Sequence, residues 1–438
     1  MCGKNLLLRK QKMKEQNGTV SAVRPWYKVD NASNMYCFAR SQKFSRTYRN
    51  GVTLDENVDI DILQAALEKT AKRYPTMNTV LRNGVFWAFL EHTDNVPKIE
   101  VENCRPGRYI IHNGESTPCY RVNVYKNRIS TDFFHGVTDG SGSFDFLRTL
   151  VTTYFELKGT KIESYGSVKN AADEPTLGEI RDSYFDYADK AAKVNKPAPE
   201  ELFIGENEQI DNFVKLIHGR FPVADVRTAA KKYSLTITEY LAAVMILMYI
   251  KCTPEPIDKP IIISIPVDLR RRFESESVRD FVFMTEVKFN PEGRTDVEFT
   301  EIADAIRGMA AKKTTKEALL NAVNINVASE RRLITSIVPY PIKSMVMKKS
   351  YEQMQYSYTT ILSNIGSLEF PPEVAPHVVE ADACLGKTPY LHFGCAAVSL
   401  NGMFNLTFTS GNENTDRQKF FFRFLANDGV RVRVDASK

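Results

Sequence analysis

The segment His-Gly-Val-Thr-Asp-Gly at residues 135–140 carries the residue types that acid–base chemistry needs. The chain has only six histidines, and His135 stands where an apolar strand pattern ends and a turn rich in small residues begins. An imidazole with an ordinary pKa of about 6.5 is mostly neutral at pH 7, as a general base must be. Gly136 and Gly140 leave room for a substrate to approach. These features predict a general base at His135, and the same pattern also fits a loop histidine without a catalytic role.

The elements on both sides of His135 can hold it at the tip of a sheet. Residues 120–134 predict two consecutive strands. Apolar side chains then repeat with helical spacing over residues 147–154, and Ser141 or Ser143 can cap that helix. His135 is therefore expected at the end of a strand, directly before a turn into a helix.

The chain lacks the sequence signatures of several other enzyme classes. It contains no Cys-x-x-Cys, no His-Glu-x-x-His, no P-loop, no Gly-x-Gly-x-x-Gly after a strand and no Gly-x-Ser-x-Gly. These absences argue against a metalloenzyme, an NTPase, a Rossmann dehydrogenase and an α/β-hydrolase. We expect neither a metal nor a nucleotide cofactor.

The composition is that of a globular protein. Of 438 residues, 43% are hydrophobic and 25% are charged, with a net charge of +5, which excludes a largely disordered chain and gives no sign of a nucleic-acid partner. The longest apolar run, residues 240–250, is shorter than the roughly 20 residues that a membrane span needs. The N-terminus has no signal-peptide core, and the seven cysteines form no close pairs. We predict a cytoplasmic protein with reduced thiols.

Strand and helix signals alternate along the whole chain, which predicts an α/β class. A stretch rich in charge, proline and small residues indicates a crossover linker at residues 176–205. It separates a first half, residues 25–175, from a second half, residues 206–438, and residues 1–24 form a basic N-terminal segment.

Three local signals lie in the second half. Capping boxes are predicted at residues 236–239 and 415–418, where Thr is followed three residues later by Glu or Gln. Asn401 and Gly402 predict a type I′ turn between two apolar strands.

The segment "FHGVTDGSGSFDFLRTL" resembles the His-His-x-x-x-Asp-Gly segment of the chloramphenicol-acetyltransferase-like superfamily of CoA-dependent acyltransferases, and most closely that of its alcohol acetyltransferase-like members. Further stretches are similar to the superfamily in the expected order, over residues 25–430. They are "LQAALEKTAKRYPTMNTVLRNGVFW", "TITEYLAAVMILM", "IPVDLRRRF" and "LSNIGSLEFP". The resemblance implies two pseudo-dimeric α/β lobes, with mixed sheets flanked by helices, and a tunnel between them with His135 near its middle.

The resemblance also implies roles for matching residues. His135 would be the catalytic base, Asp139 a structural carboxylate in a bidentate pair with Arg270, and Gly140 the residue that keeps the tunnel open. The chain departs from the pattern at Phe134, which replaces the first His, and at Asp268, which replaces an Asn.

The implied activity is that of an acyl-CoA-dependent O-acyltransferase, with a coenzyme A thioester as co-substrate and a small alcohol, or an amine, as acceptor. Ser363, Asn364 and Thr359 are candidate oxyanion or channel residues, and Ser363 and Asn364 equally suit a turn at a strand end. Two alternatives stay open. One is a carrier-protein-dependent acyltransferase, or condensation-like enzyme, of a polyketide or peptide pathway. The other is a non-catalytic binding or scaffold protein that keeps the fold.

Several basic residues could meet coenzyme A phosphates or an acidic carrier protein, although a solvated face explains them more simply. They are Arg331, Arg332, Lys343, Lys348 and Lys349. The remaining histidines are expected to be structural. They are His92, His112, His218, His377 and His392.

Overall fold

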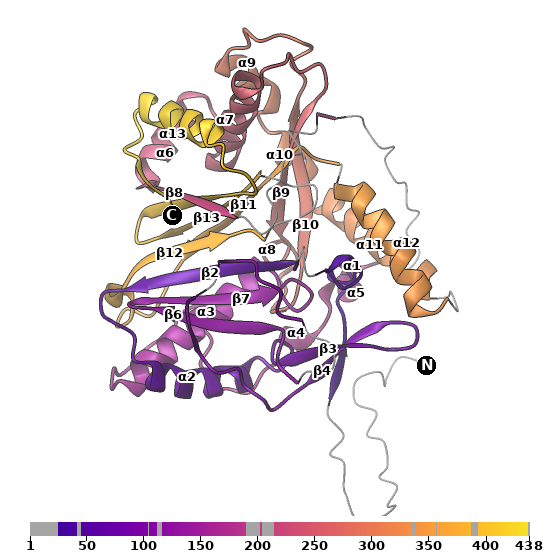
Figure 1. The fold of residues 1–438 in the computed structure, drawn as a ribbon, viewed down its shortest axis with the longest axis vertical. Coiled ribbons are helices and arrows are strands. Elements are labelled where there is room, and N and C mark those ends of the chain that lie inside the picture. The colour runs from indigo at the N-terminus through magenta and orange to yellow at the C-terminus, as the bar shows by residue number, and fades with distance from the viewer. Residues whose placement is uncertain are drawn as a thin grey trace, which may run out of the picture.

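The computed structural model describes residues 25–41, 45–103, 105–111, 116–189, 202–203, 214–334, 338–355, 357–386 and 393–436. The predictions for the basic N-terminal segment, His112 and His392 lie outside the described residues, as do those for the side chains of Arg331 and Arg332. Two large mixed layers of strands and helices form the molecule (Figure 1).

The first lobe is built on a five-stranded sheet with the order β12-β2-β7-β6-β5. Helices α2 and α3 cover one face of this sheet, and the apolar side chains between them form the core (Figure 1). A small sheet with the order β1-β4-β3 adjoins it. The elements are β1 (Trp26–Lys28), β2 (Thr47–Leu54), α2 (Ile60–Arg73), β3 (Thr79–Asn83), β4 (Ala88–His92), β5 (Glu100–Val101), β6 (Tyr120–Tyr125), β7 (Arg128–Phe134), α3 (Gly140–Leu157) and β12 (Val378–Cys384).

The second lobe is built on a seven-stranded sheet with the order β10-β9-β11-β13-β14-β8-β15. Its core helix α7 is buried from residue 239 to residue 250, as expected for a helix that is apolar on every side. The elements are β8 (Lys215–Pro222), α6 (Val223–Lys232), α7 (Ile237–Cys252), β9 (Ile261–Asp268), β10 (Val282–Phe289), α9 (Phe299–Ile306), β11 (Thr360–Leu368), β13 (Phe393–Leu400), β14 (Met403–Ser410), α13 (Asp416–Asn427) and β15 (Arg433–Ala436).

The remaining short elements and two longer helices connect the lobes. Helices α11 and α12, orange in Figure 1, lie along one side, where α11 packs on α5 and β10 and α12 packs on α1. The elements are α1 (Asn34–Ala39), α4 (Leu177–Ile180), α5 (Ser183–Tyr187), α8 (Arg270–Phe273), α10 (Met309–Lys313), α11 (Lys316–Ile334), α12 (Tyr340–Gln355) and the 3₁₀-helix η1 (Ala375–His377).

Strand β12 links the two lobes: in the chain it lies between β11 and β13 of the second lobe, and in space it belongs to the sheet of the first. It comes from the second predicted half of the sequence, yet it pairs antiparallel with β2, with Val378 opposite Leu54 and Cys384 opposite Arg49. The first lobe therefore depends on a strand that is more than 300 residues away in the chain.

Two local predictions are confirmed. Thr236 and Glu239 form a reciprocal capping box at the start of α7, with N···O distances of 3.2 and 3.0 Å. Asn401 and Gly402 have φ angles of +49° and +77°, the two positive values that a type I′ turn requires.

Two other capping predictions are wrong. Thr415 makes no side-chain cap to α13, because its backbone, at φ −118° and ψ 12°, lacks the extended conformation of an N-cap. Helix α3 is capped by Asp139 rather than by Ser141 or Ser143, since the helix begins earlier than the apolar repeat suggests.

Within the described residues, no single helix is long and apolar enough to cross a membrane. Helices α6 and α7 reach that threshold only together, and they are bent by 72°. The same residues contain no group of three or more His, Cys, Asp or Glu side chains that could hold a metal ion.

Candidate active site

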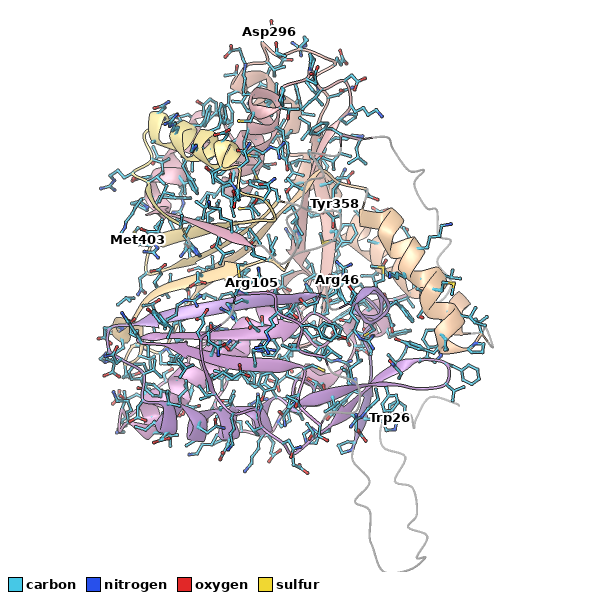
Figure 2. The ribbon with its side chains drawn as sticks, in the orientation of Figure 1. Trp26, Arg46, Arg105, Asp296, Tyr358 and Met403 are labelled. Atoms are coloured by element: carbon cyan, nitrogen blue, oxygen red, sulfur yellow. The ribbon has the colours of Figure 1, made fainter. Side chains whose placement is uncertain are left out.

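His135 follows β7 directly, at the place where the two lobes meet. Its backbone N–H donates to the carbonyl of Arg46 at 2.9 Å, and its own carbonyl accepts from Ser33 Oγ at 3.3 Å. Arg46 is labelled in Figure 2 and marks this place between the lobes. The imidazole stacks on the Tyr36 ring, with centroids 4.1 Å apart, and tilts against the Tyr48 ring at 4.9 Å. Two aromatic rings and the strand end therefore fix its orientation.

The two ring nitrogens of His135 differ in their surroundings. Nδ1 is buried and makes no hydrogen bond to a side chain of the described residues, whereas the side chain as a whole is 30% exposed, so the accessible edge of the ring is that of Nε2. Burial lowers the pKa of His135 to about 4. The ring is therefore neutral at pH 7 and offers an accessible nitrogen.

The turn after His135 is braced from inside the first lobe. Tyr48 Oη donates to the carbonyl of Asp139 at 2.8 Å and to that of Thr138 at 3.1 Å. A Cβ atom on Gly142 would lie 2.2 Å from the carbonyl oxygen of Val278, so only glycine fits there. Residue 142, which sequence reasoning did not single out, is thus the glycine that close packing requires.

Asp139 holds the turn to the second lobe. Its Oδ1 caps α3 by accepting from the N–H of Gly142 at 3.0 Å, and its Oδ2 accepts from Arg270 Nη2 and from the N–H of Phe281, both at 2.9 Å. The structure brings the predicted pair Asp139–Arg270 together. The predicted bidentate geometry is wrong, because Arg270 Nη1 binds Asp268 Oδ1 at 2.9 Å instead. With 1% exposure, Asp139 has no access to a substrate.

A group of buried carboxyls lies behind His135. Asp280 Oδ2 is 3.7 Å from His135 Nδ1 and accepts from Ser33 Oγ at 3.2 Å. Burial raises the pKa of Asp280 well above its usual range, with Asp139 and Asp30 adding to this effect. Burial also raises the pKa of Asp30 to about 8, against the pull of Arg279. No spacing in the sequence connects these residues to His135.

Strand β11 of the second lobe faces the turn of the first. A Cβ atom on Gly140 would lie 3.7 Å from Ile365 Cδ1, an ordinary contact, so the two lobes approach each other at Gly140 without closing completely. Ser363, on the same strand, is half-buried, and its hydroxyl has no hydrogen bond to any described residue. It is the one candidate oxyanion donor with a free hydroxyl.

The other two candidate donors are already engaged. Asn364 Nδ2 donates to Thr238 Oγ1 at 3.0 Å, and its Oδ1 accepts from the N–H of Gly366 at 3.2 Å. Thr359 Oγ1 donates to the carbonyl of Phe203 at 2.7 Å and accepts from the N–H of Ile262 at 3.1 Å. The hydroxyl of Thr359 therefore braces a strand end and is not free to serve as an oxyanion donor.

No protein-family model matches the chain, and no curated protein matches its sequence. Solved structures match it over nearly its whole length. Fusarium sporotrichioides TRI101, complexed with coenzyme A and T-2, has a TM-score of 0.61 at 8% identity, covering 93% of this chain and 99% of that one. The starter condensation domain of rhizomide synthetase RzmA, in complex with C8-CoA, has a TM-score of 0.60 at 10% identity, covering 93% and 98%. Polyketide synthase associated protein 5 from Mycobacterium tuberculosis has a TM-score of 0.57 at 12% identity, covering 92% and 98%.

The chain has the chloramphenicol-acetyltransferase-like fold. The resemblance stated from the sequence and the predicted two-lobed α/β fold are confirmed. Identities of 8 to 12% establish a shared fold and not a shared reaction.

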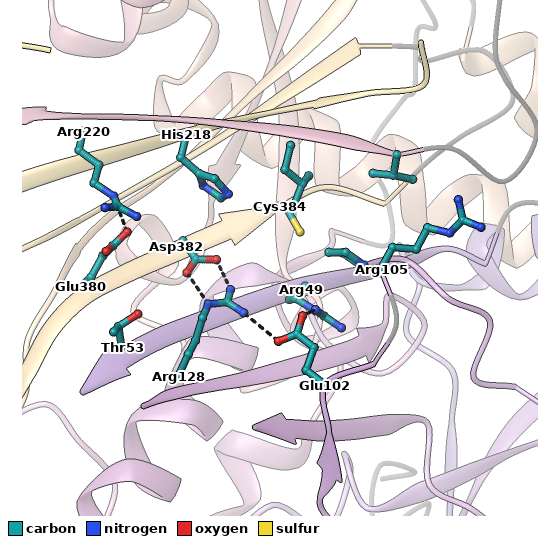
Figure 3. Close-up of a pocket in the computed structure, with 13 residues that line it drawn as sticks. Arg49, Thr53, Glu102, Arg105, Arg128, His218, Arg220, Glu380, Asp382 and Cys384 are labelled. Atoms are coloured by element: carbon teal, nitrogen blue, oxygen red, sulfur yellow. Dashed lines mark hydrogen bonds and ion pairs between the residues drawn. The ribbon is translucent and has the colours of Figure 1, made fainter. Parts of the chain in front are cut away.

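A cavity of about 430 Å³ opens between the polar face of the first sheet and β8 (Figure 3). Two ion pairs line it: Arg128 binds Asp382 at 2.6 Å on the face of the first sheet, and Arg220 on β8 binds Glu380 on β12 at 2.6 Å across the cavity. The lining residues are Arg49, Thr53, Glu102, Arg105, Pro106, Arg128, Val214, Leu216, His218, Arg220, Glu380, Asp382 and Cys384. His135 does not line this cavity, and the expected tunnel through His135 stays a prediction.

The predicted basic contacts for coenzyme A divide into two groups. Lys343 is buried, with Nζ 3.4 Å from the centre of the Trp87 ring and 3.2 Å from the carbonyl of Phe86, so the solvated position expected for it is wrong, and the side chain is not open to a phosphate either. Lys348 and Lys349 are exposed on α12 and remain available.

The described histidines other than His135 have structural neighbours. His92 Nδ1 lies 3.2 Å from the carbonyl of Pro75, and His218 Nδ1 lies 3.0 Å from Thr407 Oγ1. His377 Nδ1 lies 2.9 Å from Asp55 Oδ2. These contacts agree with the structural role expected for all three.

Proposed function

We propose that this protein is an acyl-CoA-dependent O-acyltransferase that transfers an acyl group from a coenzyme A thioester to a hydroxyl acceptor, with His135 as general base. The observation that carries the proposal is the ring of His135, which is neutral, is held between two tyrosines and presents Nε2 at the junction of the lobes. A cytoplasmic location belongs to the same proposal.

The reaction needs one base and one oxyanion donor. Nε2 of neutral His135 takes the proton of the acceptor hydroxyl while the oxygen attacks the thioester carbonyl. The tetrahedral oxyanion then collapses, the C–S bond breaks, and the leaving thiolate takes the proton back from the imidazolium. Ser363 is the proposed oxyanion donor, and one such donor is worth about 3 kcal/mol in a pre-organised site.

Asp139 and Arg270 act at a distance from the substrate in this scheme. The carboxylate fixes the turn by binding the start of α3, Arg270 and the backbone of residue 281 at once. We therefore assign both residues to positioning of His135. Gly140 would leave the gap beside Ile365 through which the reactants meet.

Structures with the same fold support the choice of substrates. One is complexed with coenzyme A and T-2, another with C8-CoA, and a third is TRI3 trichothecene 15-O-acetyltransferase from Fusarium sporotrichioides. We transfer to this chain the use of a CoA thioester and of a small-molecule acceptor.

A carrier-protein-bound donor is the second candidate function. Condensation domains, among them the condensation domain of the monacolin K polyketide synthase MokA, share the fold with a TM-score of 0.55 and 10% identity. Turnover with an acyl-pantetheine carrier protein, in the absence of turnover with acyl-CoA, would favour this function over the first.

The test of the first candidate is thiol release from acetyl-CoA and octanoyl-CoA with a panel of primary and secondary alcohols. We expect H135A to lower kcat by about 10²- to 10⁴-fold, the usual contribution of a general base. H377A is the matched control, because His377 lies on the surface beside Asp55. Equal turnover by wild type and H135A would remove the proposed base and favour a non-catalytic binding protein.

A further inference from the structure

We propose that helix α12 and the tip of the β3–β4 hairpin form a membrane-binding surface, which docks on a bilayer that carries anionic headgroups. The apolar edge, as we call this surface, consists of Val85 and Phe86 in the hairpin and of Ile342, Met345 and Val346 on α12. None of these residues has a role in the proposed reaction, so the inference is independent of that function.

Helix α12 turns apolar side chains outward. Ile342, Met345 and Val346 are 57 to 74% exposed, and their spacing of i, i+3 and i+4 places them on one face of the helix. Lys343, in contrast, is 3% exposed, with its Nζ over the Trp87 ring. A helix on the surface of a water-soluble domain ordinarily has the reverse arrangement, with apolar side chains inward and charged ones outward. This inversion indicates that the outer face of α12 meets an apolar environment.

The tip of the β3–β4 hairpin continues the same surface. Val85 is 72% exposed, and Phe86 beside it is exposed as well. The carbonyl of Val85 accepts from the N–H of Tyr340 at 2.8 Å, and that of Phe86 accepts from Lys343 Nζ at 3.2 Å. These two bonds fix the tip to the first turn of α12, and both elements lie at the margin of the molecule (Figure 1). The exposed side chains therefore belong to one contiguous surface, which marks an interaction site.

The charges beside the apolar edge select an anionic partner. Lys348 and Lys349 follow Met345 by three and four residues and are exposed, so they border the apolar side chains on the helix. The carboxylate of Glu91 on β4 is held by Arg82 at 2.8 Å. Apolar side chains flanked by lysines suit a bilayer interface, where the former enter the acyl boundary and the amines meet anionic headgroups.

A second copy of the chain fits the same surface less well. A symmetric dimer would use the same face of both copies, and would bring Lys348 and Lys349 of each into one interface. Like charges brought together oppose association. A bilayer, in contrast, accepts a projecting hairpin tip and helix without a complementary pocket.

The two tryptophans of the chain can report on docking, because both lie beside the apolar edge. Trp87 follows Phe86 and contacts Lys343, and Trp26, labelled in Figure 2, has its ring 6.1 Å from that of Phe89 on β4. Trp side chains favour the interface between headgroups and acyl chains. Their emission should therefore shift to shorter wavelength when the protein binds vesicles.

The test is co-sedimentation of the full chain with vesicles of phosphatidylcholine alone and of phosphatidylcholine mixed with phosphatidylserine. Wild type should bind the mixed vesicles more tightly, with the shift in tryptophan emission, and added salt should weaken the binding. M345Q/V346Q and K348Q/K349Q should each lower the affinity about tenfold or more.

V379T/V434T is the matched control, because it also removes two exposed apolar side chains, from β12 and β15, and should bind as wild type does. Circular dichroism should show all three variants folded, since every substituted side chain is exposed.

The outcomes decide the proposal without any measurement of turnover. Wild type that stays in the supernatant with both kinds of vesicle would overturn it, as would equal binding to neutral and anionic vesicles. Binding that M345Q/V346Q leaves unchanged, or that the control weakens equally, would also overturn it. A dimer in sedimentation velocity that M345Q/V346Q dissociates, in a protein that does not bind vesicles, would assign the apolar edge to a second copy instead.

Discussion

His135 combines an accessible ring nitrogen with a buried one, and the burial determines when the residue can act. A base works only while it is deprotonated, and burial holds the pKa of His135 at about 4. The nearby Asp139 carboxylate acts in the opposite direction, but desolvation is the larger effect.

The low pKa predicts the pH dependence of turnover. The neutral form of His135 predominates above about pH 5, so kcat/KM should stay level from pH 5.5 to 7.5 and decline only as the pH approaches 4. A pH–rate profile with a stable acyl-CoA and a non-ionising alcohol measures this dependence of kcat/KM on pH. An acidic limb centred near the ordinary value of about 6.5 would contradict the burial argument.

The same shift has a consequence for stability. A histidine whose folded pKa is depressed binds fewer protons in the folded state than in the unfolded state between pH 4 and its ordinary pKa of about 6.5. Its effect therefore destabilises the fold as the pH falls through that interval. His218, whose pKa burial also lowers, acts in the same direction, so the rate profile is the cleaner test of His135.

Only some of the residues around His135 could be predicted from the sequence. His135, Asp139 and Arg270 could be identified because the motif and the ordered stretches name them. Ser33 and Asp280 could not, since 102 and 247 residues separate the partners of their contacts and no periodicity links such distant positions.

At the scale of elements, the turn between β7 and α3 depends on where each glycine lies. The motif draws attention to Gly140, yet the packing demands Gly142. A methyl group at Gly142 would meet the carbonyl of Val278 at 2.2 Å, whereas one at Gly140 would meet Ile365 at 3.7 Å.

This difference predicts opposite results for two alanine variants. G142A should lower the free energy of unfolding by about 1 to 3 kcal/mol, because backbone must move to admit the methyl group. G140A should unfold within a degree or two of wild type, about the effect of a tolerated substitution. Thermal unfolding followed by circular dichroism compares them, and equal melting temperatures for the two variants would contradict the assignment.

The starts of helices α7 and α3 differ in how readily the sequence predicts them. The box at Thr236 forms because its partner Glu239 lies within the same turn. Helix α3 begins at Gly140 because Asp139 binds both its first turn and the second lobe. The bond that starts the helix is the local cap from Asp139 to the N–H of Gly142, and the apolar repeat alone places the boundary too late.

At the scale of the whole molecule, β12 belongs to the sheet of the first lobe although its neighbours in the chain, β11 and β13, belong to the sheet of the second. Arg128 on β7 reaches Asp382 on β12 across β2, and it passes over Gly51, where a Cβ atom would lie 2.4 Å from its Nη2. The pairing of β12 with β2 could not be predicted from the sequence, because nothing in the residues of β12 indicates which of the two sheets the strand joins. The absence of a side chain at Gly51 is one reason that the pair can form.

The ion pair between Arg128 and Asp382 makes the stability of the fold depend on pH. Burial alone would raise the pKa of Asp382, but Arg128 outweighs it and holds the pKa below its usual range. The carboxylate therefore stabilises the fold above its unfolded pKa, and this contribution is lost as the pH falls through the lower folded value.

D382A should accordingly lower the free energy of unfolding by about 2 kcal/mol, since Arg128 keeps only its longer contact of 3.4 Å to Glu102. Urea unfolding at pH 7 measures the loss, and at pH 3 the difference from wild type should shrink, because Asp382 in the unfolded chain is then largely protonated and must release its proton to form the ion pair. E380Q is the control on the same strand, because Glu380 is less buried and pairs with Arg220 at the rim. A loss in E380Q as large as that in D382A would show that the cavity as a whole, rather than the pair across Gly51, holds β12 in the first lobe.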